Sequence, residues 1–186
     1  DWAGVNIKNE SQGNEKDSTS IQYHVIQKLK EQNFDIIFDD DNAGEIADVI
    51  AIEVDDVNKK VKVELFHLKF SQEDRPGARI NDLYAVNGQA QKCVSWLHTR
   101  PEHIIGRMLR RGASGPKNRY ELGTEEQLSI IREKVKSLYE IEYIVHIVQP
   151  GLSKAAASRE QLKLLSLTEA FLWETRMIKL GVIASA

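Results

Sequence analysis

Three residues near the ends of a predicted β-hairpin, Asp48, His67 and Lys69, have side chains that suit metal-assisted hydrolysis of a phosphodiester. Two stretches rich in valine and isoleucine, residues 44–54 and 61–71, flank a polar turn, and this pattern is typical of a hairpin. Residues two apart in a strand share a face of the sheet, so His67 and Lys69 should point the same way. Pairing of the two strands is expected to bring Asp48 close to Lys69.

The chemistry follows from the residue types. Cleavage of a phosphodiester needs a divalent cation that activates water and neutralises charge on the phosphorus. Mg²⁺, with Mn²⁺ as the alternative, prefers carboxylate, carbonyl and water ligands, which Asp48 and the backbone carbonyl of Leu68 could supply. Lys69 could position the water or stabilise the developing charge. Taken singly, each residue also has a plainer interpretation: a solvated Asp48, a hydrogen-bonded core His67 and a Lys69 that extends to solvent.

Length and composition describe an ordinary globular chain. Its 186 residues suit a single domain, 1–186, with an irregular polar lead-in over 1–17. Cys93 is the only cysteine, so neither an intrachain disulfide nor a cysteine zinc cluster can form. No apolar run reaches membrane-spanning length, and we expect a cytoplasmic protein without a membrane partner. The chain begins at Asp1 rather than methionine, which suggests a domain excised from a longer protein.

The elements around the hairpin are predicted from the spacing of apolar residues and from the residues that cap or end helices and strands. In chain order they are helix 20–32, strand 34–38, the hairpin, helix 82–97, helix 103–110, helix 124–139, strand 141–148, helix 158–177 and strand 181–185. Residues 112–123 are expected to be a loop, and Pro150 should end the strand before it. The continuous apolar character of 141–148 predicts a central strand. The order of the elements predicts an α/β fold in which helices cover both faces of a mixed sheet.

The spacing of Asp48, a turn and then His67-Leu68-Lys69 resembles the PD-(D/E)XK superfamily of restriction-endonuclease-like nucleases. Longer stretches, 34–41, 66–71, 76–79, 88–92 and 148–154, resemble nuclease-like domains attached C-terminally to bacterial DEAD/DEAH-box helicases. The resemblance implies a restriction-endonuclease-like fold and Mg²⁺-dependent cleavage of DNA within a defence or repair protein. It also implies DNA and a helicase domain, in the same or a partner chain, as partners. Many relatives cut as dimers, so a homodimer is compatible with it.

One residue departs from the family pattern, because His67 stands where the family has an acid two residues before the lysine. Its neutral ring could bind a metal or orient water, or it could mark a weakened nuclease. Glu64 is a poor substitute, since strand alternation turns it away from Lys69, although a β-bulge would bring it back. Glu45, three residues before Asp48, is the nearer candidate for a second metal-binding carboxylate.

The resemblance also implies supporting glutamines. The family often places a Glu or Gln on the first helix and a Gln on the helix after the lysine strand. Gln22 takes the first position. Gln89 and Gln91 compete for the second, with Gln91 preferred and an exposed polar face as the alternative for either.

Five arginines are candidates for DNA contacts, since a guanidinium suits phosphate oxygens. Arg75 and Arg79 follow the lysine strand, where the alternative is an ordinary solvated loop. Arg107, Arg110 and Arg111 have spacing that places them on one helix face, which could bind phosphates or simply be solvated.

A rival hypothesis is a module that keeps the fold but has lost catalysis, and that binds DNA or docks on a helicase. An ion pair between Lys69 and Asp48, with no room for a metal, would favour it. A cleft around Asp48, His67 and Lys69, with another carboxylate or carbonyl within reach, would favour the nuclease. An RNA nuclease is a third and weaker alternative.

Overall fold

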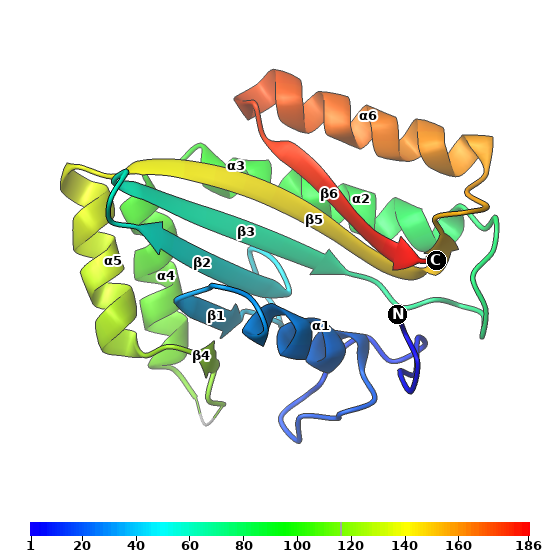
Figure 1. Ribbon diagram of the computed structural model, residues 1–186, viewed down its shortest axis with the longest axis horizontal. Coiled ribbons are helices and arrows are strands. Elements are labelled where there is room, and N and C mark those ends of the chain that lie inside the picture. Colours follow the sequence, from blue (N-terminus) through cyan, green and yellow to red (C-terminus); the bar gives the residue numbers. More distant parts are fainter. Residues whose placement is uncertain (116) are drawn as a thin grey trace.

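Six strands form one mixed sheet in the part of the chain that the structure, a computed structural model, describes: residues 1–115 and 117–186. In chain order they are β1 (Ile36–Asp39), β2 (Val49–Asp55), β3 (Lys60–Leu68), β4 (Tyr120–Leu122), β5 (Glu140–Ser153) and β6 (Lys179–Ser185). Their order across the sheet is β4-β1-β2-β3-β5-β6 (Figure 1). Neighbours from β4 to β3 are antiparallel, and β3, β5 and β6 are parallel.

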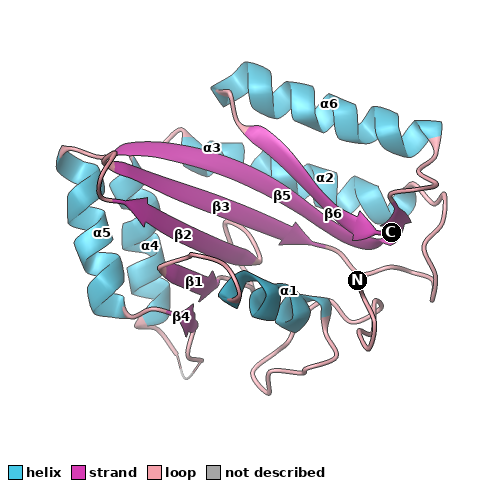
Figure 2. Ribbon diagram, viewed as in Figure 1, coloured by secondary structure: helices cyan, strands magenta, loops and turns pink. Residues whose placement is uncertain are grey.

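Helices cover both faces of this sheet, as the order of elements predicts (Figure 2). They are α1 (Ile21–Lys30), α2 (Asn81–Lys92), α3 (Val94–Leu97), α4 (Pro101–Gly112), α5 (Glu125–Ser137) and α6 (Arg159–Arg176). One core joins the apolar side of α1 to Val49 and Phe66, and a second joins α2 to α6 with Ile50 and Leu65. Alternate residues of β2 and β3 therefore serve opposite cores. No described helix combines the length and apolarity that a membrane crossing requires.

The predicted hairpin is confirmed, with later and shorter strands. β2 and β3 pair from Val49 with Phe66 to Asp55 with Lys60. Residues 44–48 form a loop instead, because Asn42 and Gly44 take left-handed backbone angles, φ 96° and 82°, that turn the chain. Asp48 consequently lies immediately before β2, and Lys69 immediately after β3.

Three other expectations need correction. The helix expected over 82–97 is divided, with α2 and α3 on either side of Cys93. The loop expected over 112–123 contains β4, which pairs with β1 at the edge of the sheet. Pro150 does not end its strand, because a register shift between Gln149 and Ser153 lets β5 continue past it. Strand 141–148 is central as predicted, since β5 lies between β3 and β6.

The lead-in of residues 1–17 is irregular, as predicted, and it packs closely against the sheet. The side chain of Gln12 is buried and donates to Asp39 Oδ2 (2.8 Å) and to Glu121 Oε1 (2.9 Å). Ile7 accepts a backbone hydrogen bond from Ser71, just beyond β3. These bonds place the lead-in beside the ends of β1 and β3.

Gly181 makes the pairing of β5 and β6 sensitive to one methyl group. A Cβ at Gly181 would lie 2.2 Å from Nδ1 of its partner His146. The imidazole cannot easily move, since it stacks on Phe66 and contacts Glu64 Oε2 at 2.6 Å. We expect Gly181→Ala to lower the free energy of unfolding by about 1–3 kcal/mol, measured by urea denaturation. Gly88→Ala in α2, where a Cβ meets nothing within 4 Å, should be neutral or stabilising. Equal losses in both variants would contradict this.

Candidate functional site

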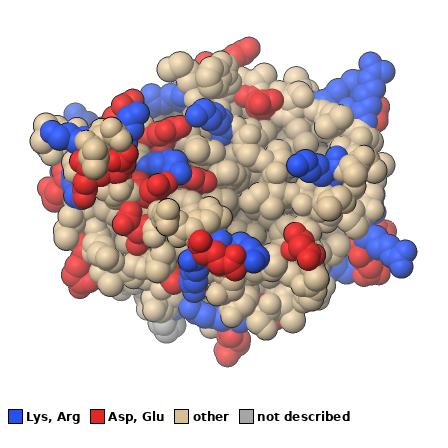
Figure 3. Space-filling model, viewed as in Figure 1, with Lys and Arg blue, Asp and Glu red and all other residues tan. Residues whose placement is uncertain are grey.

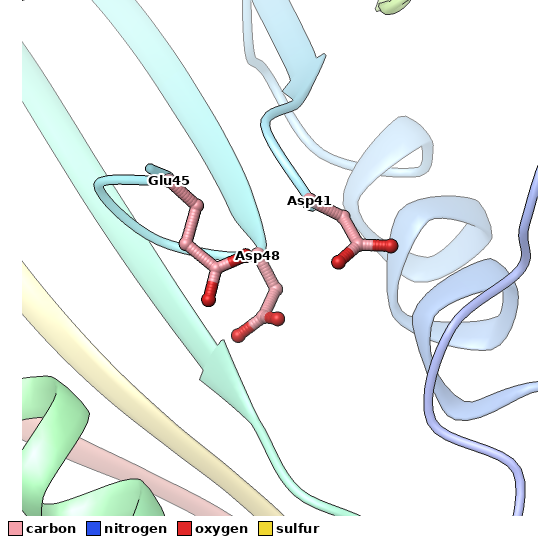
Figure 4. A group of neighbouring side chains, drawn as sticks. All are labelled: Asp41, Glu45 and Asp48. Carbon is pink, nitrogen blue, oxygen red and sulfur yellow. The ribbon is translucent and has the colours of Figure 1, made fainter. Parts of the chain in front are cut away.

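Three carboxylates gather at the loop between β1 and β2: Asp41, Glu45 and Asp48 (Figure 4). Each can offer one oxygen, and these oxygens all lie within 4.8 Å of one another. Asp48 is 5 % exposed, whereas Asp41 and Glu45 are half-buried. We call these three residues the acid group. Its members are near enough to share one cation.

Two arginines hold this loop through its backbone. Arg111 on α4 donates from Nη2 to the carbonyls of Asp40 (2.6 Å) and Asp41 (3.1 Å), and from Nη1 to that of Ala43 (3.1 Å). Its Nε also forms an ion pair with the buried Asp40 carboxylate. Arg119 donates to the Asp41 carbonyl at 3.0 Å. The guanidinium groups thus bind the carbonyl oxygen of Asp41, whereas its carboxylate accepts from Ser11 Oγ (2.5 Å) and from the backbone N–H of Asn42 (2.7 Å).

Asp48 is fixed by the end of the neighbouring strand. Its Oδ2 accepts a hydrogen bond from the backbone N–H of Leu68 at 2.8 Å. Burial raises the pKa of Asp48 well above its usual range, and the charges of Glu45, Glu10 and Asp41 raise it further. Burial, followed by the charge of Asp41, also raises the pKa of Glu45. A cation between these carboxylates would relieve both effects.

Lys69 is paired with an acid that the sequence did not single out. Its Nζ lies 2.8 Å from Glu10 Oε2, and the same oxygen accepts from the backbone N–H of Phe70 at 2.9 Å. Asp48 lies beside the end of β3, next to Lys69 in the chain's hairpin, but Lys69 forms its ion pair with Glu10 of the lead-in and not with Asp48. The charge of Glu10 nevertheless reaches Asp48, because it contributes to the raised pKa of that carboxyl.

His67 lies apart from the acid group. It is 2 % exposed, and burial lowers the pKa of its imidazole to about 3, so the ring is neutral. It lines a pocket of about 310 Å³ together with Glu45, Gln89 and Trp96. Among the described residues, the group of mutually close metal-ligand atoms does not include His67. The geometry thus does not group His67 with the carboxylates, as its expected metal-binding role would require, and Asp41 is the third member of the acid group.

The glutamines divide differently from the expectation. Gln91 donates to Thr168 Oγ1 on α6 at 2.9 Å, and among the described residues Gln89, not Gln91, lines the pocket. The preference for Gln91 is corrected because α6 occupies that side of α2. Gln22 is buried and donates to the backbone carbonyl of Asp48 at 3.3 Å, so it contacts the site from α1.

Of the two arginines that follow β3, Arg79 forms hydrogen bonds and an ion pair with other residues of the protein. Arg79 donates from Nη2 to Ser71 Oγ (3.1 Å) and to the carbonyl of Arg75 (3.0 Å), and it pairs with Asp82. Arg75 is exposed. Basic and acidic side chains are interspersed on the face shown in Figure 3.

The arginines of α4 do not form one free basic face, and the structure corrects that expectation. Arg111 is directed into the loop that precedes β2. Arg107 lies over the ring of Trp96, with its Cζ 4.7 Å from the ring centroid. Arg110 is exposed and remains a candidate for a phosphate contact.

Removing the charge of Asp48 should stabilise the protein when no divalent cation is present. Folding raises the pKa of this carboxyl, so its contribution to stability is present at low pH and is lost as pH rises through the folded-state pKa. Asp48→Asn keeps an acceptor for the Leu68 amide. In EDTA at neutral pH we expect a higher Tm, by about 2–4 °C per kcal/mol regained. The difference should shrink in acid.

The same Tm measurement, repeated with a divalent cation, tests whether the acid group binds it. Mg²⁺ or Mn²⁺ should raise the Tm of the wild type and of Glu174→Gln, whose carboxylate is exposed on α6, but not that of Asp48→Asn. An equal rise in all three proteins would show that the acid group does not hold the cation.

Arg111 and Arg110 offer a matched test of loop positioning against phosphate binding. Arg111→Met leaves the buried Asp40 carboxylate without its partner, so we expect a loss of about 3–5 kcal/mol in urea denaturation. Arg110→Met should change stability by less than about 0.5 kcal/mol. Similar stabilities of the two variants, with equal losses of DNA affinity, would instead indicate a basic DNA-binding face.

No protein-family model matches this chain, and neither a curated protein nor a solved structure matches it. Function is therefore inferred from the residues and contacts described above.

Proposed function

We propose that this protein is a nuclease that hydrolyses DNA phosphodiesters with the help of Mg²⁺ or Mn²⁺. The observation that carries the proposal is the acid group, whose three carboxylates lie within reach of one ion. No Lys or Arg ion pair joins these carboxylates among the described residues, and two of them have a raised pKa. Their hard oxygen donors fit either cation. When bound, the cation supplies a Lewis acid that activates water and offsets charge on the phosphorus.

The chain's own residues supply the remaining functions. The Leu68 amide holds one oxygen of Asp48, which leaves the other for the cation. Glu10 holds the ammonium group of Lys69 at the end of β3, where Lys69 can stabilise the developing negative charge or orient a water. Glu10 also places a carboxylate beside the lysine. We infer that it compensates in space for the acid that His67 replaces in the family pattern.

The resemblance to the PD-(D/E)XK superfamily supports the same proposal. A carboxylate immediately before one strand of an antiparallel hairpin and a lysine immediately after its partner agree with the pattern read from the sequence. We extend the proposal to a nuclease module of a helicase-associated defence or repair protein on that resemblance alone.

The rival proposal is an inactive module that binds DNA or docks on a helicase. The buried, neutral His67 favours it, since an acid is absent from that position. The ion pair between Lys69 and Glu10 weighs against the inactive module. That module predicts that Lys69 pairs with Asp48 and so blocks the metal site, whereas here Lys69 pairs with Glu10.

The test is cleavage of plasmid and linear DNA in Mg²⁺ or Mn²⁺. We expect Asp48→Asn and Lys69→Met to cut at least about 100-fold more slowly than the wild type, as removal of a group acting in the transition state predicts. Lys163→Met, at an exposed lysine of α6, should cut at the wild-type rate.

Absence of cutting by the wild type in both metals, or full activity in both site variants, would overturn the proposal. DNA binding without cutting would then favour the inactive module. Faster cleavage of a matched RNA strand would make the protein a ribonuclease.

A further inference from the structure

A pocket adjoins the acid group and shares Glu45 with it. Its volume is about 310 Å³, at the lower end of the range for small-ligand sites. One wall is the loop before β2, which contributes Gly44 and Ile46. Helices α2 and α3 also line the pocket, with Gln89 and Trp96. A group bound here would therefore lie next to whatever the carboxylates hold.

Two buried polar atoms on this pocket's lining side chains lack a protein partner. Nε2 of His67 and Oε1 of Gln89 are both buried and without a hydrogen bond among the described residues. An unsatisfied buried polar atom is costly, so native sites usually provide a ligand or water for it. Because His67 is neutral, its ring offers both a donor and an acceptor. The amide of Gln89 likewise offers both.

The rest of the lining suits a flat, uncharged group. Trp96 provides an aromatic ring, and Arg107 lies 4.7 Å from its centroid, which helps to hold it in place. Ile46 and Cys93 are buried and apolar. Lys92 is exposed where it borders the pocket, so its ammonium group is available to a phosphate. A heteroaromatic base combines apolar faces with a polar edge and is joined to phosphates, as this lining requires.

We propose that this pocket binds one unstacked nucleobase of the strand whose phosphodiester lies at the acid group. His67 and Gln89 would bond the polar edge of the base, and the ring of Trp96 would contact its face. His67 would thus bind the base, although the family pattern has a metal-binding acid at its position. That the bound base belongs to the strand being cut rests on the proposed function. Binding of the base itself needs no metal.

The experiment measures binding of a short single-stranded DNA in EDTA, where no cleavage can occur. The comparison ligand is a strand of equal length in which every base is replaced by an abasic tetrahydrofuran unit. Fluorescence anisotropy should show the wild type binding the intact strand at least about tenfold more tightly than the abasic one.

Gln89→Leu tests the pocket with little change in volume. We expect it to lose most of the preference for the intact strand. Gln127→Leu, at an exposed glutamine of α5, should keep that preference. The imidazole nitrogens of His67 in the wild type provide a readout that needs no variant. Their NMR signals should shift with the intact strand and not with the abasic one.

Equal binding of both strands, binding of neither, an unchanged preference in Gln89→Leu or unmoved His67 signals would each overturn the proposal. Failure of the pocket and failure of the nuclease are separable. A preference for the intact strand in EDTA, without cutting in Mg²⁺, would support the base-binding pocket and contradict the proposed hydrolysis. Cutting that depends on Asp48 and Lys69 without base preference would do the reverse.

Discussion

The site depends first on Arg111 and the loop that it binds. A run of three aspartates begins at the last residue of β1, and three like charges so close together oppose a tight turn. Arg111 offsets this repulsion by donating to three backbone carbonyls of the loop and by forming an ion pair with the buried carboxylate of Asp40. The remaining negative charge is left on the side of Asp41, Glu45 and Asp48. A cation bound between these carboxylates would relieve the repulsion that remains there.

Periodicity predicted the parts of the fold that are set by local sequence. The hairpin, the central position of 141–148 and the helices on both faces all follow from which residues are apolar and at what spacing. Within α2, Leu83, Val86 and Ala90 recur at helical spacing and are all buried. Periodicity could not predict what each polar side chain of α2 contacts. Gln91 contacts α6 and Gln89 contacts the pocket, although the two residues are only two positions apart.

The unpredicted part of the site comes from contacts between segments that are distant in sequence. Glu10 lies in a stretch without periodicity, and nothing near it indicates that it meets Lys69. Arg111 has the spacing of a basic helix face, yet its partners lie about seventy residues earlier in the chain. Only the tertiary structure distinguishes an arginine that holds a loop from one that meets solvent. The candidate residues Asp48, Lys69 and Glu45 were predicted from the sequence, and the structure places Asp41 and Glu10 beside them.

The position of Glu10 has a practical consequence for the design of shortened proteins. It precedes α1, so a boundary chosen at the first regular element would delete it while sparing every strand and helix. The truncated protein would keep the sequence of every strand and helix but would lose the carboxylate that holds Lys69, together with the bonds of the buried Gln12. If the proposed hydrolysis needs Lys69 in this position, the truncated protein would fail to cut DNA because of where its boundary was placed. Whether a lead-in is dispensable should be judged from the bonds it makes rather than from its lack of secondary structure.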